Sequence, residues 1–477
     1  MKKCLLLVSL AFSIFASVSA QVELSNFTAT GRGGVGVTLM TDYQSLGINP
    51  ANLGLYPFDD DGILSKKMFS IGVAEGVYST YSSALERPEL YSQFFQLENL
   101  LNPKNLDAAE KKEAAALFAD EGLQVNLDVL PVGFSVQPSE EVGGFALIWR
   151  ERMSFGLNLN ENMSGILFQG FNYTDYFDST AIVAGDTIGF ASNPLTFSEL
   201  FRGSEISWNW YREIGFGYGR KIIRNDDLAI YAGFGVKYNQ GLAYLNINAD
   251  NEVLNAISAI TPGLGVNYGV PTPSQITGSG YSPVGSGWGF EFGATVILFE
   301  KLRLGASATD LGYINWTGNV YSANDTIFNG LGSAGLDSYN VLSEIGDITG
   351  ENGLFQWNGE TKVRQQTPAK LRLGVSYDVG KILTVGADAV FPLNDAPGNL
   401  KSPFMAVGAD LKPIPWLRFS TGFMAGGGTN FNIPLGVYFT GKGKTFEIGV
   451  ASRDAVTWFV KKTPMLSLGV GLLRFKF

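Results

Sequence analysis

The sequence predicts an all-β protein: a transmembrane, outer-membrane antiparallel β-barrel of about fourteen strands with an N-terminal plug inside its lumen. Three observations predict this fold class. Apolar residues alternate with polar or small ones along most of the chain, the connections between alternating segments are long and short by turns, and only 16% of residues are charged while 13% are aromatic. The 59 glycines would also suit a disordered chain, but disordered chains are poor in aromatic residues.

The N-terminus has the features of a cleaved secretory signal. Lys2 and Lys3 precede an apolar run over 5–18, and small residues follow up to Ala20. We expect cleavage after Ala20. A retained membrane helix is the alternative, but the run is shorter than the ~18 apolar residues that such a helix needs. The chain then divides into a signal peptide (1–20), an N-terminal hatch (21–68) and a transmembrane barrel (69–477).

The alternation is clearest over 143–160. Large apolar side chains such as Leu147 and Trp149 stand at every second position, and glycine, serine, asparagine or arginine stands between them. Because successive side chains of a strand point to opposite faces, this is one long strand with an apolar and a small or polar face. The pattern predicts strand cores at 69–81, 124–137, 143–160, 204–221, 228–246, 286–299, 302–316, 355–378, 382–392, 402–412, 415–425, 431–440, 444–453 and 465–477.

Two of these strands change phase. Leu130 stands where the alternation calls for a polar or small residue, and Pro131 follows it directly. Leu472 and Leu473 are successive apolar residues. We interpret both places as β-bulges. Since proline has no N–H to give to the ladder, Leu130 and Pro131 also mark a candidate break in the barrel wall, although an ordinary bulge proline is the simpler interpretation.

The connections alternate in length. An outer-membrane barrel has long loops outside and short turns in the periplasm, and an even number of strands returns the C-terminus to the periplasm. The long connections, expected to be extracellular, are 82–123, 161–203, 247–285 and 317–354. In the first of them, Asp107 and Glu110 match a capping box ahead of an alanine-rich helix.

A secreted β-sandwich is the main alternative, because its strands also alternate. Glycine-rich polar faces and an aromatic C-terminus argue against it. Phe475 and Phe477 flank Lys476 at the end of the chain, which resembles the assembly signal of outer-membrane barrels and implies the barrel-assembly machinery as a partner. Tryptophans near strand ends fit the aromatic girdles of such barrels; they are Trp288, Trp316, Trp416 and Trp458.

Two absences restrict the chemistry. The chain has no histidine, and its single cysteine, Cys4, lies in the expected signal peptide. The mature chain therefore cannot carry a Ser-His-Asp triad, a cysteine nucleophile, a histidine-ligated metal or a zinc-thiolate site. We predict no enzyme, no metal and no cofactor, with only a carboxylate pair or a Ser-Lys dyad left open. The net charge of −10 offers no electrostatic footprint for nucleic acid.

The residues before the first strand carry the strongest functional signal. A phosphate-binding glycine loop is one interpretation, but no Lys-Ser/Thr follows and no βαβ unit surrounds it. Glycine also permits φ > 0 and close approach of the backbone, and Asn-Pro sets a turn, so we expect a compact segment folded inside the barrel. Its candidate hatch residues are Gly31, Arg32, Gly33, Gly34, Asp42, Asn49, Pro50 and Ala51.

This glycine-rich opening, followed by an aspartate and Asn-Pro-Ala ahead of the first strand, resembles the N-terminal hatch of FadL-type long-chain fatty-acid transporters. The resemblance implies a barrel with the predicted number of strands, gating by the hatch, and exit of a hydrophobic ligand sideways into the membrane. The superfamily also includes aromatic-hydrocarbon transporters and PorV-type proteins, which escort substrates of a secretion system. The stretches 143–152 and 309–316 are more similar to an uncharacterised branch of it.

Strand phase places several charges on the lumen face. Arginine binds carboxylates bidentately, so these residues include candidates for ligand contact. We expect them instead to pair with one another or with the hatch, because charges in a confined interior need partners. The candidates are Arg150, Arg152, Glu213, Lys237, Glu291, Arg303, Arg372, Asp378 and Asp388.

Three functions stay open. The favoured one is a porin-like, hatch-gated channel in a Gram-negative outer membrane that takes up a hydrophobic small molecule passively and releases it into membrane lipid. The second is a PorV-like accessory that binds proteins of a secretion or surface-assembly system. The third, a barrel enzyme acting on lipids or peptides, is disfavoured by the absence of histidine.

Overall fold

A computed structural model describes eleven stretches of the chain: residues 23, 26–55, 69–82, 105–119, 122–250, 253–339, 341, 344–351, 353–441, 445–456 and 465–477. The expected signal peptide, part of the expected hatch (56–68), part of the first long loop (83–104) and Trp458 lie outside the described residues. None of the helices in the described stretches is long and apolar enough to cross a membrane.

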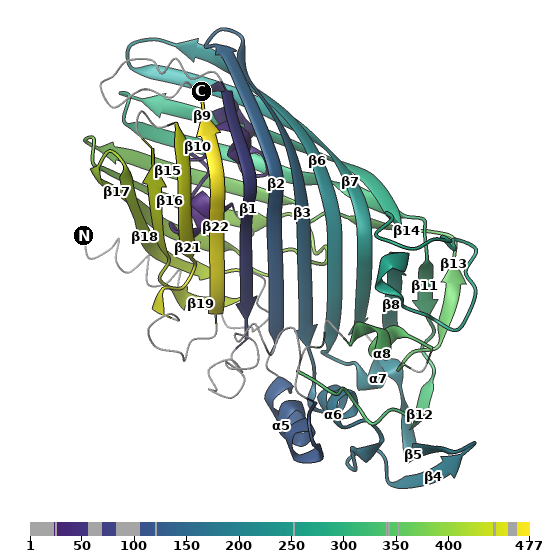
Figure 1. Cartoon of the computed structure of the whole chain (residues 1–477). Coiled ribbons are helices and arrows are strands. Elements are labelled where there is room, and N and C mark those ends of the chain that lie inside the picture. The colour runs from purple at the N-terminus through teal and green to yellow at the C-terminus, as the bar shows by residue number, and fades with distance from the viewer. Residues whose placement is uncertain are drawn as a thin grey trace.

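Fourteen antiparallel strands close into a barrel, because each pairs with the next in the series and the first pairs with the last (Figure 1). Backbone hydrogen bonds between Phe69 and Phe477 complete the seam. The predicted strand number is confirmed. The barrel strands are β1 (Phe69–Tyr81), β2 (Leu123–Ser139), β3 (Gly143–Asn158), β6 (Glu205–Arg224), β7 (Leu228–Asp250), β9 (Gly285–Leu298), β10 (Leu302–Trp316), β15 (Lys370–Val379), β16 (Leu383–Pro392), β17 (Phe404–Ile414), β18 (Leu417–Gly426), β20 (Leu435–Thr440), β21 (Phe446–Ser452) and β22 (Met465–Lys476).

Shorter elements stand at the ends of these strands. Five strands extend the barrel sheet: β8 (Val253–Ile260), β11 (Val320–Ala323), β13 (Trp357–Glu360), β14 (Val363–Gln366) and β19 (Thr429–Asn432). A separate small sheet holds β4 (Ser179–Val183), β5 (Asp186–Thr196) and β12 (Ile327–Leu331). The helices are α2 (Phe27–Thr30), α5 (Ala108–Phe118), α6 (Glu161–Gln169), α7 (Phe197–Leu200) and α8 (Ile345–Thr349), with 3-10 turns η1 (Asp42–Ser45), η2 (Pro50–Gly54), η4 (Gly170–Asn172) and η5 (Pro262–Leu264).

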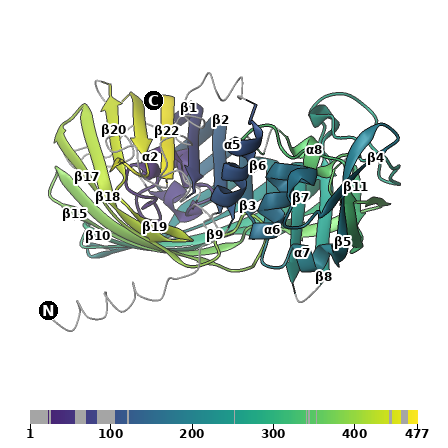
Figure 2. The same ribbon diagram turned by 90° about the horizontal axis from the view of Figure 1, so that it is seen from below.

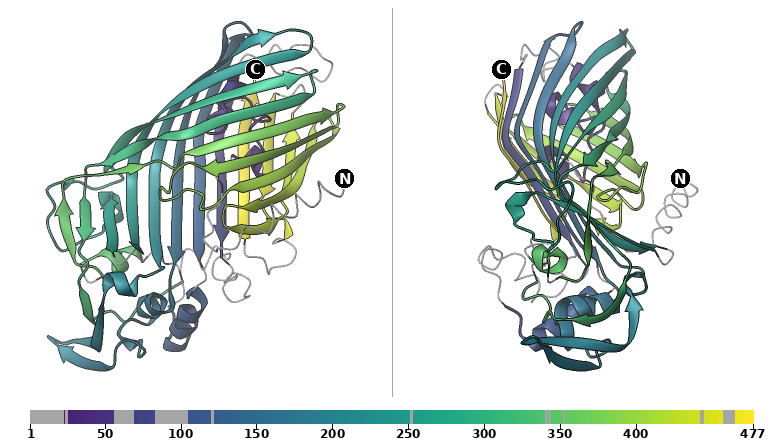
Figure 3. Two further views of the ribbon diagram at one scale, coloured as in Figure 1. Left: turned by 180° about the vertical axis from the view of Figure 1, so that it is seen from behind. Right: turned by 90° about the vertical axis from the view of Figure 1, so that its right-hand side faces the viewer.

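The barrel wall is uneven in height (Figure 3). Strand β7 has 23 residues, whereas β20 has six. We call β2 to β10 the tall wall and β15 to β22 the low wall. Helices α5 to α8 and the small sheet form a loop layer at the outer ends of the tall wall, at the opposite end from the short turns.

The loop layer has an apolar core of its own. Phe118 of α5 stacks on Phe168 of α6 with ring centroids 5.2 Å apart, and both pack in a cluster with Trp208 and Leu245 from the strand ends. Helix α5 begins at the predicted capping box, in which Asp107 accepts hydrogen bonds from backbone N–H groups of the first turn.

Large apolar side chains cover the outward face of the barrel. They are exposed at alternate strand positions while their neighbours in sequence face inward and are buried. Examples are Leu147, Phe216, Phe234, Phe292, Val407 and Phe423. An apolar surface that runs round a closed barrel is what a lipid-facing wall requires, so the barrel spans a membrane.

Both predicted bulges are confirmed. The register of β2 with β3 shifts between Val129 and Val132, around Pro131. Leu472 and Leu473 both face outward, and the register of β21 with β22 shifts beside them.

Other register shifts were not predicted, and one of them lies at Asp310 of β10. Asp310 has φ 56°, and the register of β10 with β9 shifts between Ala308 and Leu311. Beyond the shift, the inward-facing and outward-facing positions of β10 are exchanged. Trp316 therefore points inward and is 0% exposed. Its predicted place in an aromatic girdle was therefore wrong, whereas Trp288 and Trp416 are exposed by 48% and 52%.

Candidate functional site

Residues 26–55, which we call the lumenal segment, lie inside the barrel. Viewed along the barrel, the strands surround them (Figure 2). The segment contacts all fourteen barrel strands through hydrogen bonds, apolar packing or backbone proximity. A segment of this length touches every strand of a closed ring only from within. The candidate hatch residues therefore all lie in the bore.

Local chemistry explains the path of the lumenal segment. Gly33 and Gly34 have φ of 70° and 95°, where only glycine is unstrained. Asn49 caps η2 by accepting a hydrogen bond from the N–H of Ala51, with Pro50 at the first position of the turn. The amide of Asn49 also donates to Thr295 of β9 at 2.9 Å, which ties the turn to the tall wall.

Glycines of the wall make room for the segment. A Cβ on Gly233 of β7 would lie 2.4 Å from the carbonyl oxygen of Pro50, and one on Gly293 of β9 would lie 2.0 Å from Oδ1 of Asn49. Contacts this short do not occur, so the glycine-rich inner faces of the strands are a requirement of the packed bore.

Ion pairs fasten the other side of the segment to the low wall. Arg32 donates to Asp410 of β17 at 2.6 Å, and Asp42 pairs with Arg474 of β22 at 2.5 Å. Asp388 of β16 accepts hydrogen bonds from the backbone N–H groups of Gly36 and Val37 at 2.6 and 2.9 Å. Each partner comes from a different strand, so the segment is held at several points round the bore.

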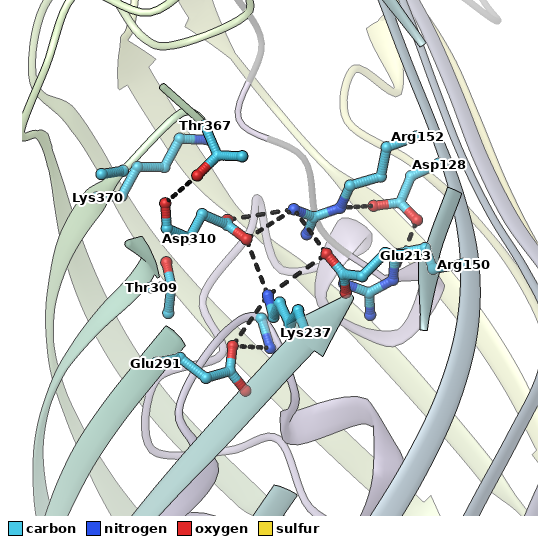
Figure 4. A network of polar contacts seen from close by, with 12 residues as sticks. Asp128, Arg150, Arg152, Glu213, Lys237, Glu291, Thr309, Asp310, Thr367 and Lys370 are labelled. Atoms are coloured by element: carbon cyan, nitrogen blue, oxygen red, sulfur yellow. Dashed lines mark hydrogen bonds and ion pairs between the residues drawn. The ribbon is translucent and has the colours of Figure 1, made fainter. Parts of the chain in front are cut away.

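A network of buried charges crosses the bore beside the segment (Figure 4). The Nζ atom of Lys237 lies 2.8 Å from Asp310, 3.0 Å from Glu291 and 3.5 Å from Glu213. These four side chains come from β6, β7, β9 and β10, so the network joins adjacent strands across the inner face of the tall wall.

Two arginines extend the network to β2 and β3. Arg152 lies 3.1 Å from Asp310 and 3.6 Å from Asp128. Arg150 lies 3.4 Å from Asp128. The network thus combines three cations with four carboxylates, all buried. It confirms that the lumen charges pair with one another.

The network also grips the lumenal segment. Glu291 accepts a hydrogen bond from the N–H of Gly47 at 2.9 Å, and Arg150 donates to the carbonyl of Leu46 at 3.3 Å. Gly47 has φ 83°, and a Cβ there would lie 2.7 Å from the guanidinium of Arg150. The charges therefore hold the stretch between η1 and η2 through hydrogen bonds to its backbone. This arrangement suits a structural anchor and not a catalytic centre.

The remaining predicted lumen residues separate into two places. Arg372 pairs with Glu23 inside the bore, and Lys370 lies 2.9 Å from the same carboxylate. Burial alone would raise the pKa of Glu23, but the two cations lower it to about 2. Arg303 and Asp378 pair with each other at 2.8 Å near the short turns, about a quarter exposed, so they lie at the rim and not in the enclosed bore.

The sequence reasoning missed several members of the site. Asp128 follows the alternation of β2 and was detectable by the same phase argument that found Glu213. Asp310 was hidden, because the bulge at that residue breaks the phase of β10. Lys370 and Asp410 follow the alternation of β15 and β17 and were detectable in the same way, whereas Glu23 had no local signal because it precedes the first strand.

An apolar pocket filled by Tyr43 lies behind the predicted wall break. Tyr43 packs with Leu46, Leu130 and Ile148 on the inner face of β2 and β3, and its hydroxyl donates to Glu75 of β1. Burial, with the nearby Glu75 carboxylate, raises the pKa of Tyr43 well above its usual value, so the phenol stays a neutral donor.

The ladder is interrupted beside Tyr43. The register of β1 with β2 pairs Val73 with Val132 and Glu75 with Leu130, which leaves Ala74 and Pro131 unpaired. Ala74 is also skipped in the pairing with β22 and has φ 56°. The wall is therefore locally weakened on both sides of Ala74, at the level of the apolar pocket.

Other candidate sites in the described residues have less support. A cavity of about 260 Å³ in the loop layer is lined by Leu106, Lys111 and Gln169. Within the described stretches, no three acidic or other metal-binding side chains are grouped to hold a metal ion.

A family model supplies the classification. The model of a family of unknown function, DUF5723, matches residues 89–450, well over half of the chain. The chain belongs to this family. No curated protein matches this DUF5723 member.

Solved structures that are similar to this DUF5723 member share little sequence identity with it. They include a TodX deltaS2S3 mutant monoaromatic hydrocarbon channel (12% identity, TM-score 0.46, covering 97% of this chain and 99% of that chain) and the Pseudomonas putida toluene transporter TodX (12%, 0.41, 96% and 98%). A Pseudomonas aeruginosa FadL homologue matches at 11% identity and a TM-score of 0.40, covering 96% and 97%. The FadL family is the one that the N-terminal segment resembles.

Proposed function

We propose that the protein is an outer-membrane channel in which the lumenal segment gates the passive uptake of a hydrophobic small molecule. The observation that carries this proposal is the apolar pocket occupied by Tyr43, directly behind the weakened wall at Ala74 and Pro131. A hydrophobic ligand that displaces the Tyr43 ring enters a pocket lined by Leu46, Leu130 and Ile148. From there the path to membrane lipid leads through the interrupted ladder.

The polar contacts of the bore give the gate its closed state. The lumenal segment is held by ion pairs and backbone hydrogen bonds in addition to small apolar clusters around Phe27, Val35 and Tyr43, so its attachment is divided among several separate contacts. Bulk passage of ions and sugars is blocked while the segment is in place, and the candidate hatch residues Arg32, Asp42 and Asn49 are the proposed fastenings.

A disulfide lock tests the proposal. The Cβ that Gly305 lacks would lie 2.9 Å from Cγ1 of Val37, which is near the separation of Cβ from the opposite sulfur in a disulfide. The mature chain has no cysteine of its own if cleavage follows Ala20. The Val37→Cys/Gly305→Cys variant, reconstituted in liposomes, should take up the fluorescent probe N-phenyl-1-naphthylamine only after reduction.

A second variant tests the role of Tyr43 independently of the engineered disulfide. Tyr43→Ala empties the pocket and should raise probe uptake several-fold, whereas Trp288→Ala on the outward face should leave it unchanged. If oxidised and reduced double-cysteine variants take up the probe equally, and Tyr43→Ala behaves as wild type, the lumenal segment does not gate a hydrophobic path.

The alternative function, a PorV-like accessory of a secretion or surface-assembly system, is favoured by the loop layer. A folded layer with its own apolar core is more than a channel needs at its mouth. Affinity capture from native membranes distinguishes the two: a stable partner lost on deleting β4 and β5, together with no probe uptake by wild type, would favour the accessory role.

A further inference from the structure

The apolar belt of the tall wall ends in two successive rows of outward-facing residues. The lower row is mostly aromatic and consists, in register across six strands, of Trp149, Ile214, Tyr238, Trp288, Tyr313 and Gln366. The next row toward the loop layer is polar: Glu151, Arg212, Gln240, Ser286, Asn315 and Arg364. A change from aromatic to polar residues within one step marks the depth at which hydrocarbon gives way to lipid headgroups.

The two cations of the polar row differ in their partners. Arg212 is neutralised, because its Nε lies 2.5 Å from Glu151, whose carboxylate also accepts hydrogen bonds from the indoles of Trp149 and Trp210. Arg364 stacks on Tyr313 instead, with its guanidinium carbon 3.7 Å from the ring centroid. In the stretches that the structure describes, no carboxylate forms an ion pair with Arg364.

A second exposed cation stands beside Arg364. Lys362 is exposed and lies just before β14, two residues from Arg364 and on the side away from the hydrocarbon. It too has no ion-pair partner among the described residues. Strand β14, which carries Arg364, pairs only with β10 within the described part of the chain. Both cations therefore stand at the step between the tall and low walls, where the open edge of β14 leaves space for a headgroup.

We propose that Arg364 and Lys362 bind a phosphate group of a lipid in the outer leaflet. A guanidinium offers a phosphate two parallel N–H donors, and the Tyr313 ring holds that plane at headgroup depth. Lys362 adds a point charge above it. Each cation near an anionic membrane surface strengthens binding by about fivefold. The aromatic row below contacts the first carbons of the acyl chains, so the bound species is a membrane lipid and not free phosphate.

The test compares lipids with and without phosphate. Native mass spectrometry of the purified full chain in uncharged detergent measures binding of lipid A bearing two phosphates and of the same lipid after dephosphorylation. Wild type should prefer the phosphorylated lipid, and Lys362→Gln/Arg364→Gln should weaken its binding on the order of 25-fold while leaving the dephosphorylated lipid unaffected. Excess inorganic phosphate should not displace the lipid.

Matched variants keep the result unambiguous. Lys301→Gln/Lys381→Gln removes the same charge from exposed residues at the short turns and should leave binding unchanged. Arg364→Lys should retain part of the preference. The proposal fails if wild type binds both lipids equally, or if the short-turn variant loses as much affinity as Lys362→Gln/Arg364→Gln. Heat-modifiable migration on gels verifies that each variant folds.

Discussion

The molecule contains two buried interiors of different chemistry. The bore combines glycine-flanked backbone, amides and paired charges such as Lys237 and Asp310 with small apolar clusters. The loop layer is filled by aromatic and aliphatic side chains, with Phe118 on Phe168 and Tyr268 on Tyr321, whose centroids are 3.9 Å apart. Both interiors belong to the same strands, at different heights.

The difference follows from what surrounds each region. Within the membrane the apolar residues of a strand face lipid, so the inner face must be small or polar and is held by directional contacts. Beyond the membrane the strands stand in water, and the ordinary hydrophobic effect assembles a core. The bore should therefore respond sharply to the loss of one charge, and the loop layer to the loss of apolar volume.

The largest effect is expected from Lys237→Met. This change leaves Glu213, Glu291 and Asp310 with an uncompensated buried charge, which should destabilise the barrel by about 3–5 kcal/mol. The measurement is the temperature at which heat-modifiable migration is lost. Lys401→Met is the control, because the side chains of Lys401 and its partner Glu205 are 38% and 24% exposed and the expected loss is below ~1 kcal/mol. Equal melting of the two variants would contradict the contrast.

Phe168→Ala should act on the other interior. Its ring is fully buried against Phe118, so truncation should cost about 3–4 kcal/mol within the loop layer. Limited proteolysis should cut the layer faster, while the barrel keeps its melting temperature. Ile182→Ala, at a side chain 78% exposed in β4, should change neither. A lower barrel melting temperature in Phe168→Ala would show that the two interiors are one cooperative unit.

The same contrast explains how far the sequence predicts the structure. Alternation is a local signal, so β1 and β10 have the bounds that it predicts, and it places Glu213 and Lys237 on the lumen face correctly. It cannot predict partners: Arg32 pairs with Asp410, 378 residues away. It also fails where a bulge changes phase, as at Asp310, which hid that carboxylate and misplaced Trp316.

The secondary structure of the loop layer could not be predicted from the sequence, for a different reason. Strands β4, β8 and β11 lie inside segments predicted only as long loops. The apolar residues of β8 and β11 serve a core assembled from distant loops, so these short strands carry little alternation of their own. Secondary structure of this kind is imposed by packing, and no single segment carries its pattern.

Glu23 provides a pH test of the bore. Its pKa of about 2 in the folded chain is below the ordinary value of 4.5, so its stabilising effect is complete above about pH 4.5 and is lost as pH falls toward 2. Hydrogen exchange in the lumenal segment should therefore accelerate over this range. At pH 7, Glu23→Gln should weaken the segment by about 2 kcal/mol, whereas Glu300→Gln, at an exposed turn, should not. Unchanged exchange in Glu23→Gln would show that the other fastenings suffice.

The smallest effect separates two ways of stabilising α5 in the loop layer. Asp107 accepts hydrogen bonds from the N–H groups of Ala109 and Glu110, and its charge also lies at the positive end of the helix. Asp107→Ala should cost about 1 kcal/mol, measured as faster exchange of the Ala109 and Glu110 amides. Asp107→Asn keeps the acceptor but not the charge and should retain most of the stability, since asparagine caps as well as aspartate. If Asp107→Asn frays the helix as much as Asp107→Ala, the charge is the stabilising element, and the loop layer depends on electrostatics more than its apolar core suggests.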